Sequence, residues 1–372
     1  MLILIKVMEW CVLRNSHRYC YKFIKITKYI LLMLAFVSKL SRKFHSPVNF
    51  RGDTLRSSEL LYGIHPVLYA LTFRQRDIYQ LYTKDISSNY KNHDNLIELS
   101  TLQITEKALK HGIPVTRVPV EKLKELSNSR AHQGVMLEVS PITIQAISDL
   151  SIKNMLLPWN NLSGYCLPHA EKCNRPTVLL LDHVMDIMNF GSILRSAAFF
   201  GVSAVILSTA PCVSPSPLIS KLSVGAMESI RFYRLTDTVM DMKSFSKAGF
   251  VIVGTCGENQ LPPNKVSKPT NLLHPNEVFA NNDNNTGIYS RPLVLALGSE
   301  SRGLSENIFN ACDLLLRIPG FGDSTKFNHC VSLSIPSSLN VAVATGILLY
   351  QLTVYRNGYE AANKSSFILH TK

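Results

Sequence analysis

The chain has 372 residues, of which 46% are hydrophobic and 17% are charged, and its formal net charge at pH 7 is +13. This length accommodates two or three domains with real cores, and the composition excludes a disordered chain and a protein with many membrane spans. The positive charge is concentrated at the start, because residues 1–52 hold ten Lys and Arg residues against one acid, Glu9.

Residues 1–52 form a basic, transit-like segment. Basic and apolar side chains are interleaved in it, which is typical of an organellar presequence drawn to anionic membranes. The apolar run Tyr29–Val37 is too short to span a bilayer core, which needs about 20 residues. We therefore predict import into the mitochondrial matrix without stable membrane insertion. A signal anchor and an extension without function are the alternatives.

Residues 58–142 alternate short strands with helices and predict one small α/β domain. Its expected elements are a helix within Ser58–Phe73, a strand at Leu96–Leu99, a helix at Gln103–His111, a strand at Val115–Val120, a helical turn at Glu121–Leu126 and a strand at Val135–Val139. Residues 143–175 lose this periodicity and contain several Pro, Asn and Gly residues, so we expect a linker there.

The eight cysteines are scattered and include no C-x-x-C pair, which favours reduced thiols in an intracellular compartment over a disulfide scaffold. Cys166, His169 and Cys173 lie close together in the predicted linker, where zinc is an alternative. No fourth ligand accompanies them, and a structural zinc site needs four. We therefore expect no metal site.

Residues 176–357 predict a second, larger α/β domain. Strands are expected at Thr177–Asp182, Val202–Ser208, Ile230–Leu235, Phe250–Cys256, Leu293–Leu297 and Leu314–Ile318, and helices at Ser192–Phe200, Leu218–Glu228, Val239–Ala248, Leu304–Phe309 and Leu339–Tyr355. Residues 257–290, rich in Asn and Pro, indicate a long loop. Strands that alternate with helices predict an open, mostly parallel sheet, with ligand chemistry beyond the carboxyl ends of its strands.

Several familiar catalytic signatures are absent from the sequence. It contains no G-K-[ST] phosphate loop, no G-x-S-x-G, no H-E-x-x-H and no G-x-G-x-x-G that opens a helix after the first strand of this domain. Three other segments stand near the ends of predicted strands: Leu181–Gly201, Leu295–Gly303, and Ile318–Gly320 with the later Ser337–Thr345. Each alone has a structural interpretation as a helix cap, a turn or a solvated helix face.

In this order the segments resemble the motifs of the SpoU (TrmH) branch of the SPOUT RNA ribose methyltransferases. The first motif, D-x-x-N-x-G-x-x-x-R-[ST]-A, is matched by Asp186, Asn189, Gly191, Arg195, Ser196 and Ala197. The second motif, G-x-E-x-x-G, is matched by Gly298, Glu300 and Gly303. The third motif, I-P with S-L-N-V-x-V-A, is matched by Ile318, Pro319 and residues 338–344. Lys221–Glu228 resembles the family's K-x-S-x-G-A-x-E helix, and Gly63–Val67 and His132–Val135 resemble its small RNA-binding domain.

The third motif departs from the family pattern. The family keeps I-P and S-L-N close together, whereas here Leu339 follows Ile318 by 21 positions. A second Ile-Pro, Ile335-Pro336, lies immediately before Ser337. We prefer Ile318 for the cofactor loop because it ends a strand-like run, and Ile335 is the alternative.

The resemblance implies a C-terminal trefoil-knot domain with a mostly parallel sheet, preceded by a small α/β RNA-binding domain, in a homodimer whose paired knots complete each active site. The implied cofactor is S-adenosyl-L-methionine, held near Gly298, Ile318 and Leu339, and no metal is required. Arg195 is the implied catalytic residue, which clamps a phosphate and stabilises developing negative charge. Asn189 and Glu300 position Arg195 and the ribose, and Asn340 supports the loop.

Together with the basic segment, the resemblance implies 2'-O-methylation of a guanosine ribose in mitochondrial large-subunit rRNA. The family's motifs are shared by rRNA- and tRNA-modifying members, so a tRNA methyltransferase is an alternative. A non-catalytic RNA-binding factor for ribosome assembly is another, because the third motif is stretched.

Overall fold

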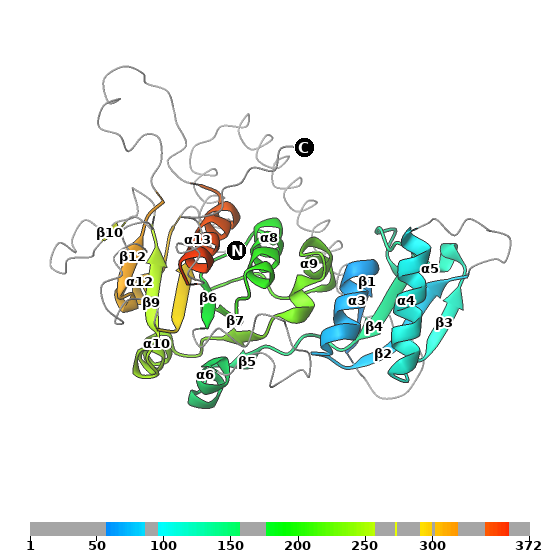
Figure 1. Ribbon diagram of the computed structural model, residues 1–372, viewed down its shortest axis with the longest axis horizontal. Coiled ribbons are helices and arrows are strands. Elements are labelled where there is room, and N and C mark those ends of the chain that lie inside the picture. Colours follow the sequence, from blue (N-terminus) through cyan, green and yellow to red (C-terminus); the bar gives the residue numbers. More distant parts are fainter. Residues whose placement is uncertain are drawn as a thin grey trace, which may run out of the picture. The chain divides into compact units, whose positions relative to one another are not determined.

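Figure 1 shows the computed structural model, which describes residues 57–85, 96–156, 176–256, 272–273, 291–299, 302–318 and 339–356. The predicted transit-like segment and the group of Cys166, His169 and Cys173 lie outside the described residues. So does most of the Asn-rich segment 257–290, of which β10 (Leu272–Leu273) is described.

The small domain is built on a four-stranded sheet with the order β1-β4-β2-β3. Its elements are β1 (Glu59–Tyr62), α3 (Ile64–Phe73), β2 (Ile78–Lys84), α4 (Leu96–Lys110), β3 (Val115–Val118), α5 (Val120–Leu126) and β4 (Val135–Val139). Strand β4 pairs antiparallel with both β1 and β2, and β2 pairs parallel with β3. The predicted α/β character of this region is confirmed.

Three details of the small domain differ from the sequence prediction. Within Ser58–Phe73, where the sequence predicts a helix, residues 59–62 form the strand β1, and Gly63 with its φ of 96° separates this strand from α3. The expected strand Leu96–Leu99 is the first turn of α4, because a short apolar run does not distinguish a strand from a helix. Strand β2 was not predicted at all, although it pairs with two neighbours.

The large domain contains an eight-stranded sheet with the order β10-β12-β9-β11-β6-β7-β8-β5, and its strands pair in parallel. After β5 (Gln145–Ala146), its strands are β6 (Thr177–Leu181), β7 (Ala204–Leu207), β8 (Phe232–Arg234), β9 (Val251–Thr255), β10, β11 (Leu293–Leu297) and β12 (Leu314–Leu316). The predicted mostly parallel sheet is confirmed. Residues 319–338, between β12 and the helix that begins at Val341, lie outside the described residues, so the trefoil knot implied by the resemblance stays a prediction.

Both faces of this sheet are covered by helices. On one face Leu179 and Leu181 of β6 belong to a core shared with α8 (Ile187–Phe199), α9 (Pro217–Leu222), the 3-10 helix η2 (Ala226–Ser229) and α13 (Val341–Arg356). On the other, Val178 and Leu180 pack with α6 (Asp149–Leu156), α10 (Thr238–Lys247) and α12 (Glu306–Ala311). Successive strand residues alternate between the faces, which explains the continuous apolar runs in the sequence.

The helix predicted from Ser192 begins at Ile187 instead, because the Asp186 carboxylate caps it by accepting a hydrogen bond of 2.7 Å from the Asn189 amide. The helix expected over Leu218–Glu228 is divided into α9 and η2, with Gly225 at a φ of 82° between them. The predicted linker 143–175 contains β5, which extends the large sheet through β8, and α6.

The described residues contain the free cysteines Cys212, Cys256 and Cys312. Burial raises the pKa of the Cys256 thiol to about 11 and that of Cys312 to about 12, so these two thiols stay protonated at neutral pH. Within the described ranges, no three His, Cys, Asp or Glu side chains gather as a metal site. Nor does any helix there combine the length and hydrophobicity needed to cross a membrane.

Candidate active site

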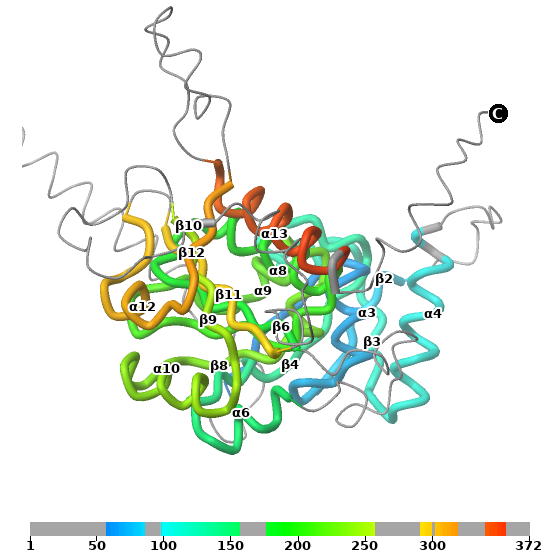
Figure 2. Tube along the Cα trace, turned by 60° about the vertical axis from the view of Figure 1, so that its left-hand side comes forward, coloured from blue at the N-terminus to red at the C-terminus, as the bar shows by residue number. Residues whose placement is uncertain are grey.

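The three motifs meet where the parallel strands end. Asp182 follows β6, Gly298 follows β11, and Ile318 comes two residues after β12. Since β12, β9, β11 and β6 are neighbours in parallel, their carboxyl ends lie at one edge of the sheet. Figures 1 and 2 both show α13 alongside α8 beside this sheet.

A direct hydrogen bond joins the first motif to the third. The Asn340 side-chain amide donates to Asn189 Oδ1 at 2.8 Å. Asn340 Oδ1 in turn accepts from the backbone amides of Ala342 at 2.9 Å and Val343 at 3.3 Å, which caps α13. One side chain therefore begins α13 and ties it to the first turn of α8.

Gly298 occupies a position where a side chain has no room. A Cβ there would lie 2.2 Å from the carbonyl carbon of Gly303, because the chain folds back through the bridge between Ser299 and Gly303. Their backbone amides and carbonyls exchange hydrogen bonds of 2.9 Å and 3.2 Å. The glycine of the second motif is thus required by the loop that it opens.

Gly191 allows α8 to pack closely on α9. A Cβ at this position would lie 2.8 Å from Leu222 Cβ. The residue lies inside the helix, so its role is close packing rather than the turn that its isolated motif suggests. This contact holds α8 against the element that carries Lys221.

Arg195 is exposed on α8. It follows Asn189 by six residues, so its side chain leaves the helix about 120° around the axis and about 9 Å further along. Among the described residues its guanidinium has no ion-pair partner. The charge is therefore available to a molecule that binds this face of α8.

The two remaining cofactor candidates, Ile318 and Leu339, lie on either side of residues 319–338, which are outside the described residues. Ile318 is half-buried against the core that α8 and α13 share. Leu339 is 47% exposed and lies two residues before α13. Glu300 and Ile335 lie outside the described residues, so the choice between Ile318 and Ile335 stays a prediction.

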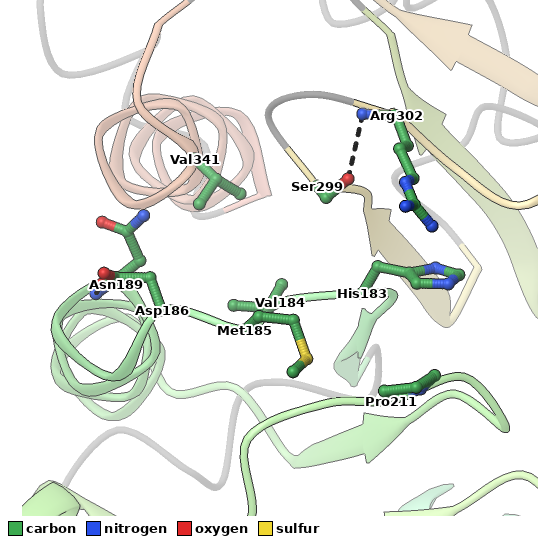
Figure 3. Close-up of a pocket in the computed structure, with 9 residues that line it drawn as sticks. All are labelled: His183, Val184, Met185, Asp186, Asn189, Pro211, Ser299, Arg302 and Val341. Atoms are coloured by element: carbon green, nitrogen blue, oxygen red, sulfur yellow. Dashed lines mark hydrogen bonds between the residues drawn. The ribbon is translucent and has the colours of Figure 1, made fainter. Parts of the chain in front are cut away.

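An open cleft of about 480 Å³ lies at this edge of the sheet. It is lined by His183, Val184, Met185, Asp186, Asn189, Pro211, Ser299, Arg302 and Val341. Figure 3 shows Asp186 and Asn189 at the start of α8 facing Val341 of α13, with His183 and Arg302 at the other end. The cleft lining thus takes residues from all three motifs.

His183 and Arg302 were not among the predicted site residues. His183 lies two residues after β6 and has a φ of 56°, a left-handed conformation that is uncommon for a residue other than glycine. The Arg302 backbone amide donates to Ser299 Oγ at 3.1 Å, which shapes the turn (Figure 3). The only sequence signal for these two residues is their position: His183 lies two residues, and Arg302 five residues, after the end of a buried strand.

Asp182 holds the loop that follows the second motif. Its carboxylate is fully buried at the end of β6, and Oδ2 accepts a hydrogen bond of 2.6 Å from the Ser305 backbone amide. Ser305 is the N-cap of α12. A carboxylate bound in this way links the first motif segment to the loop that follows the second through a single side chain.

Comparison with known proteins agrees with this geometry. The sequence profile of the SpoU rRNA methylase family matches residues 176–350, and that of the RNA 2'-O ribose methyltransferase substrate-binding domain matches residues 60–145. The chain belongs to the SpoU methylase family.

Three similar proteins illustrate the relationship. "rRNA methyltransferase 1, mitochondrial" of Schizosaccharomyces pombe is 31% identical over 310 residues, which are 79% of this chain and 89% of that protein. The 23S rRNA (guanosine-2'-O-)-methyltransferase RlmB of Shewanella oneidensis is 28% identical over 80% of this chain and 97% of its own length. The crystal structure of the SpoU methyltransferase AviRb from Streptomyces viridochromogenes, in complex with the cofactor AdoMet, has a TM-score of 0.53 at 20% identity, covering 81% and 91% of the two chains.

Proposed function

We propose that this chain transfers a methyl group from S-adenosyl-L-methionine to the 2'-hydroxyl of a guanosine ribose in mitochondrial large-subunit rRNA. The observation that carries the proposal is the hydrogen bond between Asn340 and Asn189, which joins two family motifs beside the cleft. The names of the similar fission yeast and Shewanella proteins support both the reaction and the RNA.

The cleft fits a cofactor of this kind, since its volume lies within the range of about 300–1,000 Å³ found for small-molecule sites. We assign the adenosine to the backbone at Gly298 and to the apolar side chains of Ile318 and Leu339. When bound, S-adenosyl-L-methionine supplies an electrophilic methyl group on its sulfonium. The chain's own contribution is alignment of the hydroxyl with that methyl group.

Arg195 is assigned as the catalytic residue. A guanidinium stays protonated because its pKa is above about 12, so it acts as a charge rather than as a base. It clamps an RNA phosphate with two parallel hydrogen bonds and stabilises the negative charge that develops on the attacking oxygen. Asn189 and Glu300 are assigned to position Arg195 and the ribose, and Asn340 supports the loop by capping α13.

Replacing Gly298 with valine is expected to abolish cofactor binding, because a branched side chain displaces the Gly303 backbone and with it the loop. Isothermal titration with S-adenosyl-L-methionine measures this loss. Gly346→Ala is the matched control, since a Cβ at Gly346 meets only Ser196 Oγ at 4.0 Å. Wild-type affinity of Gly298→Val would contradict the assigned loop.

We assign a homodimer in which α8 and α13 face the partner subunit. These neighbouring helices expose Met188 (56%), Phe199 (81%), Val343 (51%) and Tyr350 (60%), and apolar surface of this kind marks interaction sites. The exposed position of Arg195 on α8 suits a residue that acts across such an interface.

The double variant Phe199→Lys/Val343→Lys is expected to be monomeric, because two charges are placed in the interface. Light scattering at micromolar concentration measures the mass. Leu150→Lys is the control, since Leu150 is 69% exposed on α6, at the opposite face of the sheet. A wild-type chain that is monomeric at this concentration would refute the homodimer.

We place the protein in the mitochondrial matrix. The basic segment 1–52 and the mitochondrial name of the similar fission yeast protein support this location. The division into a transit-like segment 1–52, a substrate-binding domain 58–142, a linker 143–175 and a methyltransferase domain 176–357 belongs to the same proposal.

The decisive experiment maps ribose methylation across mitochondrial rRNA and tRNA in cells with and without this protein. Loss of one guanosine mark from large-subunit rRNA is the expected result. Loss of a methylation mark confined to a tRNA would identify tRNA, instead of rRNA, as the substrate. An unchanged map would favour a non-catalytic assembly factor, the alternative suggested by the 21 positions between Ile318 and Leu339.

A further inference from the structure

Three sequence segments that the proposed chemistry does not use meet where the small domain packs on the large one. They are Gly63–Val67, His132–Val135 and Lys221–Glu228, and all belong to one compact unit, Ser58–Lys372. Gln133 Oε1 accepts hydrogen bonds from the Ile64 backbone amide at 3.3 Å and from Lys221 Nζ at 2.7 Å. We call this junction of the three segments the seam.

The backbone at the seam is held in an unusual conformation. Gln133 has a φ of 54°, which is uncommon for a residue other than glycine and carries a conformational cost. The Gly134 amide donates to His132 Nδ1 at 3.1 Å across the same turn. This turn directs the Gln133 amide group toward the large domain. Left-handed residues of this kind cluster at ligand sites.

Basic side chains gather at the seam around Lys221. The Lys221 ammonium donates to a neutral amide oxygen, and among the described residues no carboxylate forms an ion pair with it. Burial lowers the pKa of Lys221. The pKa of His132 is lowered first by burial and then by the charges of Lys124 and Lys221, so three groups that can carry positive charge lie near one another. A partly desolvated cation without an anion is costly, and a bound anion relieves that cost.

We propose that the seam binds a phosphodiester of the RNA backbone, with Lys221 as its central contact and His132 and Lys124 beside it. The inference rests on the proposed function and deepens it by naming a contact outside the catalytic cleft. Because Lys221 belongs to the large domain and His132 and Lys124 to the small one, a phosphate here contacts both domains. It therefore fixes the RNA relative to the cleft, as phosphate contacts do in protein–nucleic acid complexes.

The test is the salt dependence of RNA binding by Lys221→Met. The probe is a transcript of mitochondrial large-subunit rRNA, bound by the full chain over a range of salt concentrations. Loss of one phosphate contact is expected to reduce the slope of log K against log salt by about 0.7–0.9 and to weaken binding at low salt. Lys221→Arg, which keeps the charge, should retain the wild-type slope.

The matched control is Lys247→Met, the same change at an exposed position on α10, at the opposite face of the sheet. Its slope should equal that of the wild type. An unchanged slope for Lys221→Met, provided its circular dichroism melting curve is that of the wild type, would overturn the proposal and leave Lys221 as a structural tie. Methyl transfer by the wild-type chain to the same transcript is measured in parallel. The salt dependence of binding then tests the phosphate site at the seam, and the methyl transfer separately tests the proposed reaction.

Discussion

Replacing Arg195 with alanine is expected to lower the turnover of methyl transfer by about 10²–10³-fold, the cost of removing one donor that stabilises developing negative charge. The affinity for S-adenosyl-L-methionine should stay unchanged, because Arg195 does not line the cleft. An interaction made mainly in the transition state affects kcat more than binding. Single-turnover assays with labelled cofactor, together with calorimetry, measure the two quantities.

Two companion variants make this result specific. Arg195→Lys keeps the charge but cannot form two parallel hydrogen bonds, so it should recover only part of the rate. Arg291→Ala removes an exposed arginine from the amino-terminal side of β11, at the end of the strand away from the cleft, and should turn over like the wild type. Wild-type turnover by Arg195→Ala would remove this residue from the mechanism.

Replacing Arg76 with methionine is expected to lower the free energy of unfolding by about 3–5 kcal/mol, the typical cost of removing one partner from a buried ion pair. The Arg76 guanidinium binds Glu228 and Glu59 at 2.9 Å each, and the Glu228 side chain is fully buried. Without Arg76, the Ser220 hydroxyl at 2.7 Å is the one hydrogen-bond partner that Glu228 keeps within the part of the chain that the structure describes. Urea denaturation followed by circular dichroism measures the change.

The pH dependence of this loss identifies its cause. Burial raises the pKa of Glu228 above its ordinary value of 4.5, against the opposing effect of Arg76. In Arg76→Met the lowering effect of Arg76 is absent, so the pKa of Glu228 is raised further. The variant is therefore most stable while Glu228 is protonated, and its free energy of unfolding falls as the pH rises through this elevated pKa. The variant should therefore approach the wild type below pH 4.5 and diverge from it at neutral pH.

Glu228→Gln is the informative control, because Arg76 still binds Glu59 and donates to the Ser140 carbonyl at 3.0 Å. Glu228→Gln should lower the free energy of unfolding by less than Arg76→Met does. The double variant Arg76→Met/Glu228→Gln should recover part of the loss, since it leaves no buried charge behind. An equal cost for both single variants at every pH would contradict the role assigned to the buried carboxylate.

The large domain was more predictable from sequence than the small one, and burial explains the difference. Strands such as Leu293–Leu297 are covered on both faces, so their residues are all apolar and their position is plain. Strand β2 has partly exposed residues at its start and was missed. The strand predicted at Leu96–Leu99 was wrong because a short apolar run, here with Ile97 and Leu99 exposed on a helix, does not distinguish a strand from a helix.

The sequence by itself determined the family, the order of the motifs and the carboxyl-terminal sheet edge as the place of the site, because these depend on residue types at fixed local spacings. The tertiary structure decided which motif residues touch. The hydrogen bond between Asn340 and Asn189 spans 151 positions, and Arg76 and Glu228 are 152 positions apart. Such contacts depend on how α13 and the small domain pack, and neither local propensity nor periodicity encodes that packing.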